Sequence, residues 1–139
     1  MISQTIILWV RYVRTFSRIY GEIVHSLRET DITAPQLDIL VCLHRGGSLP
    51  LNEIAKRLLL SGGNVTGVVD RLERDGFVKR IRSTEDRRIV NIAITEQGIR
   101  TVKQVLPIYD RKINAIFSGL TVKERKTFRR LLKKVSPKL

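Results

Sequence analysis

The amino-acid sequence predicts a mainly α-helical fold with one small β-hairpin. Apolar residues recur at three- and four-residue intervals along most of the chain, which is the spacing of amphipathic helices. This period changes between residues 77 and 95, where two short apolar runs flank the charged segment 83–88, a pattern typical of a hairpin. A helix followed directly by a hairpin with a basic tip is the arrangement of a winged helix-turn-helix.

The composition indicates one globular domain with an anionic partner. A chain of 139 residues with 42% hydrophobic content is long enough and apolar enough to bury a core. Its net charge of +13 favours nucleic acid or an anionic membrane surface as the partner. Residues 96–139 carry +9 of that charge, whereas the helix and hairpin of 61–95 carry only +2. Charge alone therefore does not identify a DNA-binding surface.

The residues that commonly support catalysis or metal binding are few. The single cysteine, Cys42, excludes a disulfide within the chain and suits a reducing, cytoplasmic location. Because Cys42 lies between Val41 and Leu43 in a predicted helix, we expect a buried apolar thiol. His25 and His44 have no partners at metal-ligand spacing. We expect no catalytic residues, no metal and no cofactor, and hence not an enzyme.

The first predicted helix runs from about Gln4 to Arg28. Arg11 and Arg14 interrupt its apolar N-terminal run, which is too short to span a bilayer. Seven of its apolar residues keep a three-then-four spacing: Ile6, Trp9, Val13, Phe16, Tyr20, Ile23 and Leu27. Val10, Ile19 and Val24 widen this stripe. Either this helix buries one face on its own domain and the other on a second copy, or it has a single broad core face.

Three further helices are predicted before the hairpin. The second begins with a capping box of Thr33 and Gln36 and ends at Gly46-Gly47. We expect its buried stripe to comprise Leu37, Leu40, Val41 and His44, and Leu49 to form a one-residue strand. The third helix spans about 51–59, and only a tight turn separates it from the fourth. Ser61 is the expected N-cap of the fourth helix, whose apolar stripe is Val65, Val68, Val69 and Leu72.

Two helices follow the hairpin, which makes six. The fifth opens at Thr95-Glu96-Gln97-Gly98 and ends at Ser118-Gly119, with a kink expected at Pro107 because proline removes one backbone donor. The sixth begins with a capping box of Thr121 and Glu124. Basic residues cover its non-apolar faces: Lys123, Arg125, Lys126, Arg129, Arg130, Lys133 and Lys134.

The ordered set of these segments resembles the MarR family of bacterial transcriptional regulators. The matching residues are Thr33, Gln36 and Leu40, followed by segments 51–58 (LNEIAKRL), 65–73 (VTGVVDRLE), 76–80 (GFVKR), 86–88 (DRR) and 94–98 (ITEQG). They follow one another in the order of the family between residues 33 and 98. The resemblance implies a single domain over 1–139, with dimerisation helices at about 1–30 and 100–139 and a winged helix-turn-helix at about 33–98.

The resemblance also implies a function. It predicts a homodimer that binds a palindromic operator in double-stranded DNA, and we expect this regulator to be a repressor. It also predicts that a small ligand, bound between the dimerisation and DNA-binding parts, modulates DNA binding. Peroxide-sensing branches of the family carry a reactive cysteine in the first helix, and this chain has none there. Two alternatives stay open: a non-specific architectural nucleic-acid-binding protein, and a basic protein on anionic membranes.

The fourth helix is the predicted recognition helix. Opposite its apolar stripe lie Gly63, Gly67, Asp70 and Arg74. Because glycine lowers helix stability, its presence on this face needs another reason. One interpretation is that the helix backbone approaches DNA closely at these positions. The alternative is a frayed first turn that becomes ordered only on DNA. Because Asp70 would repel phosphate, we expect Arg74 four residues on to hold it. The predicted DNA contacts are Ser61, Gly62, Gly63, Asn64, Thr66, Gly67 and Arg71; Asn64 suits adenine, Thr66 suits thymine and Arg71 suits a phosphate.

The hairpin tip is the predicted wing contact. Asp86 and Arg88 match the Asp-x-Arg pair of the family, which implies that the carboxylate braces the turn while Arg88 enters a narrow minor groove. Arg87 would then be free for phosphate. The alternative is a solvated charged loop. The predicted wing residues are Arg82, Asp86, Arg87 and Arg88.

Overall fold

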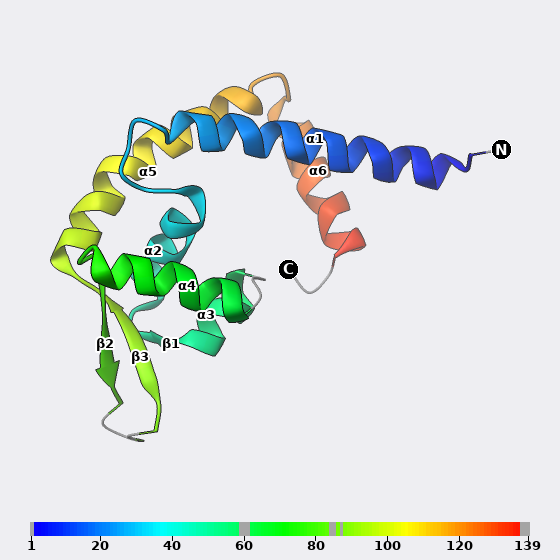
Figure 1. Ribbon diagram of the computed structural model, residues 1–139. Coiled ribbons are helices and arrows are strands. Elements are labelled where there is room, and N and C mark those ends of the chain that lie inside the picture. Colours follow the sequence, from blue (N-terminus) through cyan, green and yellow to red (C-terminus); the bar gives the residue numbers. More distant parts are fainter. Residues whose placement is uncertain (1, 59–61, 84–85, 87, 137–139) are drawn as a thin grey trace.

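The computed structural model describes residues 2–58, 62–83, 86 and 88–136, which form six helices and three short strands. Figure 1 shows the helices gathered above a protruding hairpin. The elements are α1 (Gln4–Ser26), α2 (Ala34–Gly46), β1 (Leu49–Pro50), α3 (Leu51–Leu58), α4 (Gly62–Arg74), β2 (Val78–Arg82), β3 (Val90–Ile94), α5 (Glu96–Ile116) and α6 (Val122–Val135). The predicted fold class is confirmed.

The sheet is antiparallel with the strand order β1-β3-β2. In the predicted hairpin, Val78 of β2 lies opposite Ile94 of β3. On the other side of β3, Leu49 lies opposite Ile92, so the strand expected at Leu49 exists and is two residues long. Because β3 is the central strand, it connects the helix-turn-helix to the hairpin.

Helix α2 occupies the centre of the core and contacts α3, α4, α5 and β3. Its side chains Leu37, Ile39, Leu40 and Leu43 are at most 1% exposed. Each such buried side chain contributes about 1.5–3 kcal/mol to folding. His44, which the sequence placed on the buried stripe, is exposed. That prediction was wrong although His44 lies on the same side of α2 as the buried Leu37, because His44 is in the last turn of the helix, where the buried stripe has ended.

The helix ends follow the sequence closely. The Thr33 hydroxyl accepts from the Gln36 backbone (3.4 Å) while the Gln36 side chain accepts from the Thr33 backbone (2.9 Å), so the first capping box is confirmed. Thr121 and Glu124 form the second. Gly47 ends α2 with a φ of 73°, a conformation that glycine adopts without strain. Helix α5 continues through Pro107 as one helical segment.

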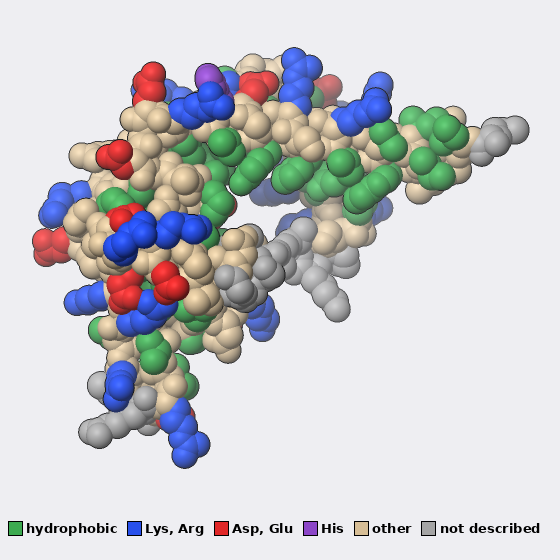
Figure 2. Space-filling view, viewed as in Figure 1, with side chains coloured by type: hydrophobic (Ala, Val, Ile, Leu, Met, Phe, Trp, Pro, Cys, Tyr) green, Lys and Arg blue, Asp and Glu red, His purple; other side chains and the backbone are tan. Residues whose placement is uncertain are grey.

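Helix α1 lies on α5 only through its C-terminal half. The Lys112 ammonium of α5 pairs with Glu22 of α1 at 2.8 Å, and Ile23 is the one buried residue within α1. The apolar stripe nearer the N-terminus is exposed, with Ile6 at 52%, Trp9 at 63% and Phe16 at 56%. Figure 2 shows hydrophobic side chains along the lower side of α1. A single broad core face for α1 is therefore excluded within this chain.

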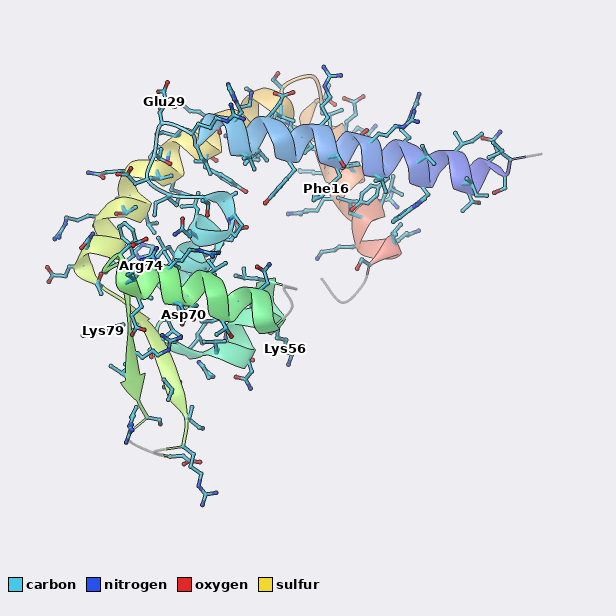
Figure 3. All side chains as sticks on the ribbon, in the orientation of Figure 1. Phe16, Glu29, Lys56, Asp70, Arg74 and Lys79 are labelled. Atoms are coloured by element: carbon cyan, nitrogen blue, oxygen red, sulfur yellow. The ribbon has the colours of Figure 1, made fainter. Side chains whose placement is uncertain are left out.

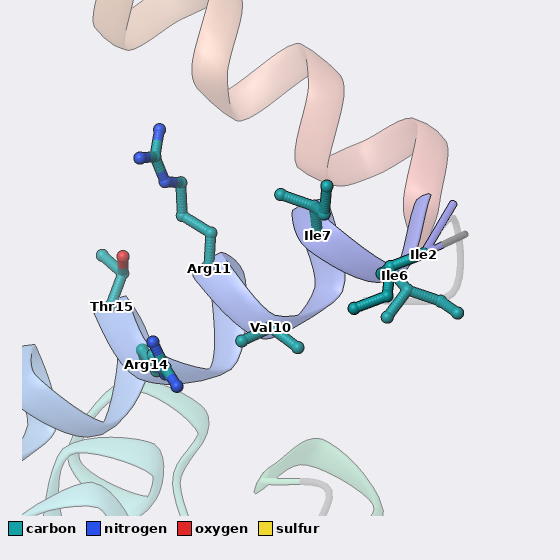
Figure 4. A pocket seen from close by; sticks show the side chains of 7 residues that line it. All are labelled: Ile2, Ile6, Ile7, Val10, Arg11, Arg14 and Thr15. Atoms are coloured by element: carbon teal, nitrogen blue, oxygen red, sulfur yellow. The ribbon is translucent and has the colours of Figure 1, made fainter. Parts of the chain in front are cut away.

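A shallow groove continues this exposed stripe. It has a volume of about 500 Å³ and is lined by Ile2, two positions before α1, and by residues of α1 itself: Ile6, Ile7, Val10, Arg11, Arg14 and Thr15 (Figure 4). Helix α6 likewise has no buried residue, and its Phe128 ring lies at a tilt of 42° to the ring of Phe117. None of the described helices combines the length and the apolar character that a membrane span requires.

Candidate nucleic-acid interface

Helix α4 buries one face and presents the other to solvent. Val65, Val68, Val69 and Leu72 are at most 2% exposed and pack against α2 and α3. On the opposite face, the predicted contacts Asn64, Thr66 and Arg71 are exposed. The sequence therefore assigned the two faces of α4 correctly.

Helix α4 contains three glycines, Gly62, Gly63 and Gly67, and the last of them lies in open space. The helix begins at Gly62 and includes Gly63, whereas Ser61, its expected N-cap, lies outside the described residues. At Gly67 a Cβ atom would meet nothing within 4 Å. Packing within the chain therefore does not require glycine at position 67, although glycine weakens a helix by about 1 kcal/mol relative to alanine.

The charges on α4 are arranged differently from the prediction. Arg74 pairs with its neighbour Asp75 at 3.2 Å and does not hold Asp70. Asp70 instead pairs at 2.5 Å with Arg80, which comes from β2. The i+4 prediction was wrong because β2 runs back beside α4 and offers a closer cation. Figure 3 shows Asp70 and Arg74 on α4 with β2, marked by Lys79, beside them.

Arg80 also binds a second carboxylate of α4. Its guanidinium pairs with Glu73, and its backbone N–H donates to the same carboxylate at 3.0 Å. The hydrogen bond to Asp70, followed by that to Glu73, raises the pKa of Arg80, which therefore stays cationic. The sequence analysis missed this contact, because Arg80 lies ten residues from Asp70 and no helical or strand period connects the two positions.

The described part of the hairpin tip has the turn that the sequence predicted. The Asp86 carboxylate accepts from the backbone N–H of Arg88 at 2.9 Å, and the Ile89 N–H donates to the Asp86 carbonyl at 2.9 Å. The brace by Asp86 is therefore confirmed. The side chains of Arg82 and Arg88 are exposed, and Arg87 lies outside the described residues. That these arginines contact DNA stays a prediction.

A cavity of about 300 Å³ lies where the helix-turn-helix meets α5. Its lining mixes apolar side chains with two arginines: Leu37, Asp38, Val41, Cys42, Arg45, Arg57, Leu58, Leu106 and Tyr109. The pKa values of Cys42, Asp38 and Tyr109 are all raised, mainly because burial disfavours the charged form of each group. Each group therefore holds its proton to a higher pH than it would in water. Cys42 is only partly buried, and its raised pKa disfavours the reactive thiolate.

Comparison with known proteins places this chain in one family. The model of the MarR family matches residues 32–90, which extend from just before α2 to the start of β3. The chain is also 32% identical over 133 residues to the HTH-type transcriptional regulator YkoM of Bacillus subtilis, over 96% of this chain and 86% of that protein. The chain belongs to the MarR family. The resemblance found in the sequence is thereby confirmed.

Two solved structures share the fold over almost the whole chain. A cysteine-to-serine mutant of MarR from E. coli, complexed with operator DNA, is 27% identical with a TM-score of 0.87 and covers 96% of both chains. BpsR of Bordetella bronchiseptica, whose DNA binding is regulated by 6-hydroxynicotinic acid, is 25% identical with a TM-score of 0.85. That match covers 93% of this chain and 98% of BpsR.

Proposed function

We propose that this MarR-family protein is a sequence-specific DNA-binding transcriptional regulator that acts as a repressor. The observation that carries the proposal is the outward face of α4, where polar side chains surround a glycine that packing does not require. A helix with such a face enters the major groove in helix-turn-helix proteins, while a wing contacts the adjacent minor groove. The similar E. coli protein in complex with operator DNA supports this assignment.

The protein is proposed to bind a palindromic operator as a homodimer. Helices α1 and α6 leave large apolar side chains exposed, including Trp9, Phe16 and Leu131 at 63%, 56% and 47%. A contiguous apolar surface of this kind marks a protein interface. Two copies joined there would present two recognition helices, which bind half-sites one helical turn of DNA, or a multiple of it, apart. The domain division into dimerisation helices and winged helix-turn-helix follows from this assembly.

A small ligand is proposed to regulate DNA binding from the cavity beside α5. The cavity touches α2 and α3 of the helix-turn-helix as well as Leu106 and Tyr109 of α5, so an occupant would contact both functional parts. Its apolar walls and Arg45 suit a small aromatic acid. The regulation of BpsR by 6-hydroxynicotinic acid supports this class of ligand. We propose no catalytic activity and a cytoplasmic location.

Operator selection tests the central proposal. The protein is incubated with sheared genomic DNA, recovered fragments are sequenced, and affinities are measured for the best fragment and for a scrambled duplex. We expect an inverted repeat that binds at least about 10³-fold more tightly than the scrambled duplex. The affinity should fall with salt by a log–log slope of about −0.9 for each neutralised phosphate. A specificity ratio near one would support the architectural alternative and overturn the proposal.

The dimer and the ligand have separate tests. Phe16→Glu places a charge on the exposed stripe, so sedimentation should show dissociation to monomers. Arg18→Glu on the same helix is the control and should leave the dimer intact. A dimer in both variants would exclude this interface.

For the ligand, hydroxylated aromatic acids are titrated into the protein–operator complex. Release from the unaltered protein but not from Val41→Trp, which fills the cavity, is the expected result. Equal release from both would exclude this cavity.

A further inference from the structure

We infer that Arg80 is a positioning residue for operator binding: it holds Asp70 and Glu73 of α4 and offsets part of their negative charge, without itself contacting DNA. The inference rests on the proposed function, since it concerns how α4 approaches phosphate. Figure 2 shows acidic and basic side chains intermingled over α4 and the adjoining strand. Some of these acids form ion pairs within the chain, and the cations without such pairs remain available for DNA.

The recognition helix carries two acids in a place where acids oppose its function. The Asp70 side chain is 58% exposed and lies on the outward face with Gly67, while that of Glu73 is 36% exposed and lies toward β2. Within about one Debye length, near 8 Å in physiological salt, such carboxylates repel backbone phosphates. Both acids therefore need a cation before α4 can enter a groove.

Arg80 is the cation that the fold supplies to both. Its guanidinium contacts Asp70 at 2.5 Å through one terminal nitrogen and Glu73 through the other. Among the described ion pairs no other cation contacts either acid, because Arg74 is engaged with Asp75. One arginine therefore binds both acids and reduces their combined charge from −2 to −1, which leaves Arg71, a residue with no described ion pair, available for DNA.

The fold holds Arg80 in this position. The backbone N–H of Arg80 donates to the Glu73 carboxylate at 3.0 Å. In the sheet, Arg80 lies opposite Ile92 of the central strand β3, and the side chain of Ile92 is fully buried. The side chain of Arg80 is only 32% exposed. Two of its donor groups already point at carboxylates, so a phosphate would have to displace one of them. This geometry favours an indirect role over a phosphate contact.

The test compares affinities for the selected operator fragment and for a scrambled duplex of equal length. Arg80→Ala should bind the operator about 10-fold more weakly, because two uncompensated carboxylates then face phosphate. The triple variant Asp70→Asn/Glu73→Gln/Arg80→Ala should regain most of that loss, and Arg80→Lys should lie between Arg80→Ala and the unaltered protein. Lys79→Ala, on the same strand and in no described ion pair, is the matched control for loss of one positive charge.

Each outcome has a distinct meaning. If the unaltered protein does not distinguish operator from scrambled duplex, the proposed function fails. If it does, and Arg80→Ala binds as well as Lys79→Ala, only the inference is wrong. A triple variant as weak as Arg80→Ala, with a salt slope reduced by about 0.9, would identify Arg80 as a direct phosphate contact and overturn the inference.

A second variant covers the case in which Arg80→Ala does not fold. Asp70→Asn/Glu73→Gln keeps Arg80 and removes the negative charge, so its operator affinity should equal or exceed that of the unaltered protein. A folded double variant, by circular dichroism, with an affinity about 10-fold lower would show that the carboxylates themselves are required and would overturn the inference.

Discussion

Gly98, in the first turn of α5, lies directly against the backbone carbonyl of Phe77. A Cβ atom at position 98 would collide with that oxygen and come within 2.7 Å of Ile94 Cγ1. Beside it, the Thr95 hydroxyl donates to the Gly76 carbonyl at 2.7 Å and accepts from the Gly98 N–H at 3.1 Å. The start of α5 is thus fixed to the junction between α4 and β2, which joins the proposed DNA-binding and dimerisation parts.

Gly98→Ala should therefore destabilise the fold. The added methyl group meets backbone, which cannot rotate away, so we expect a loss of about 1–3 kcal/mol in the free energy of unfolding. Chemical denaturation at a fixed protein concentration measures it. Gly21→Ala in α1, where a Cβ meets nothing within 4 Å, is the control and should not destabilise the chain. Equal stability of both variants would contradict the close approach at Phe77.

Gly67→Ala should separate stability from DNA binding. Because a Cβ there is unopposed and the residue lies within α4, the variant should be more stable by about 0.5–1 kcal/mol. Operator affinity should nevertheless fall if the α4 backbone approaches DNA at this point. Denaturation and fluorescence anisotropy on the same sample measure the two effects. A variant that is stabilised and binds unchanged would exclude backbone approach at Gly67.

The wing tip should contribute affinity through Arg88 and shape through Asp86. Arg88→Ala should weaken operator binding by about 10-fold or more while the dimer stays folded. Asp86→Ala removes the acceptor of the Arg88 N–H and should give a smaller loss through a looser turn. Gel-shift titration gives both values. If Arg88→Ala retains full affinity, the hairpin tip is a solvated loop and the wing contact is wrong.

Cys42 should behave as a protonated, slowly reacting thiol. Burial raises its pKa above the ordinary value of 9.0, with Glu53 adding to this rise and Arg57 opposing it. The folded state therefore binds the thiol proton more tightly than the unfolded state, so this group's contribution to stability is constant below pH 9 and falls above it. Alkylation at pH 7 should be slower than for a free thiol, and peroxide should not release operator DNA. Fast alkylation at pH 7 would contradict the burial.

The sequence predicted what local periodicity and capping determine. The faces of α4, both capping boxes, the hairpin and the turn at Asp86 follow from residue spacings of two to four, and the structure confirms them. The partner of Asp70 could not be found in this way, because Arg80 reaches it only after the chain reverses at Gly76. The prediction for His44 failed for a related reason: a helical stripe indicates which side of the helix is buried, whereas tertiary packing decides how far along the helix that side is covered.

The candidate site is predicted less completely than the fold. Exposure of Asn64, Thr66, Arg71 and Arg88 agrees with the expected role of these residues, but exposure follows from the same periodicity that predicts the helix. The missing information concerns charges that meet from different elements. Glu73 and Arg80 were visible in the sequence, and nothing in their spacing indicated that one neutralises the other.

The exposed stripe of α1 has a consequence for how the regulator responds to its own abundance. If that stripe is covered only by a second copy, folding and assembly are linked, and the stability of the protein rises with its concentration. The amount of assembled regulator at low expression then varies with the square of the subunit concentration. A cell that halves synthesis of this protein would then lose more than half of the assembled regulator. Occupancy of the operator would therefore change more steeply with protein concentration than the DNA-binding step alone predicts.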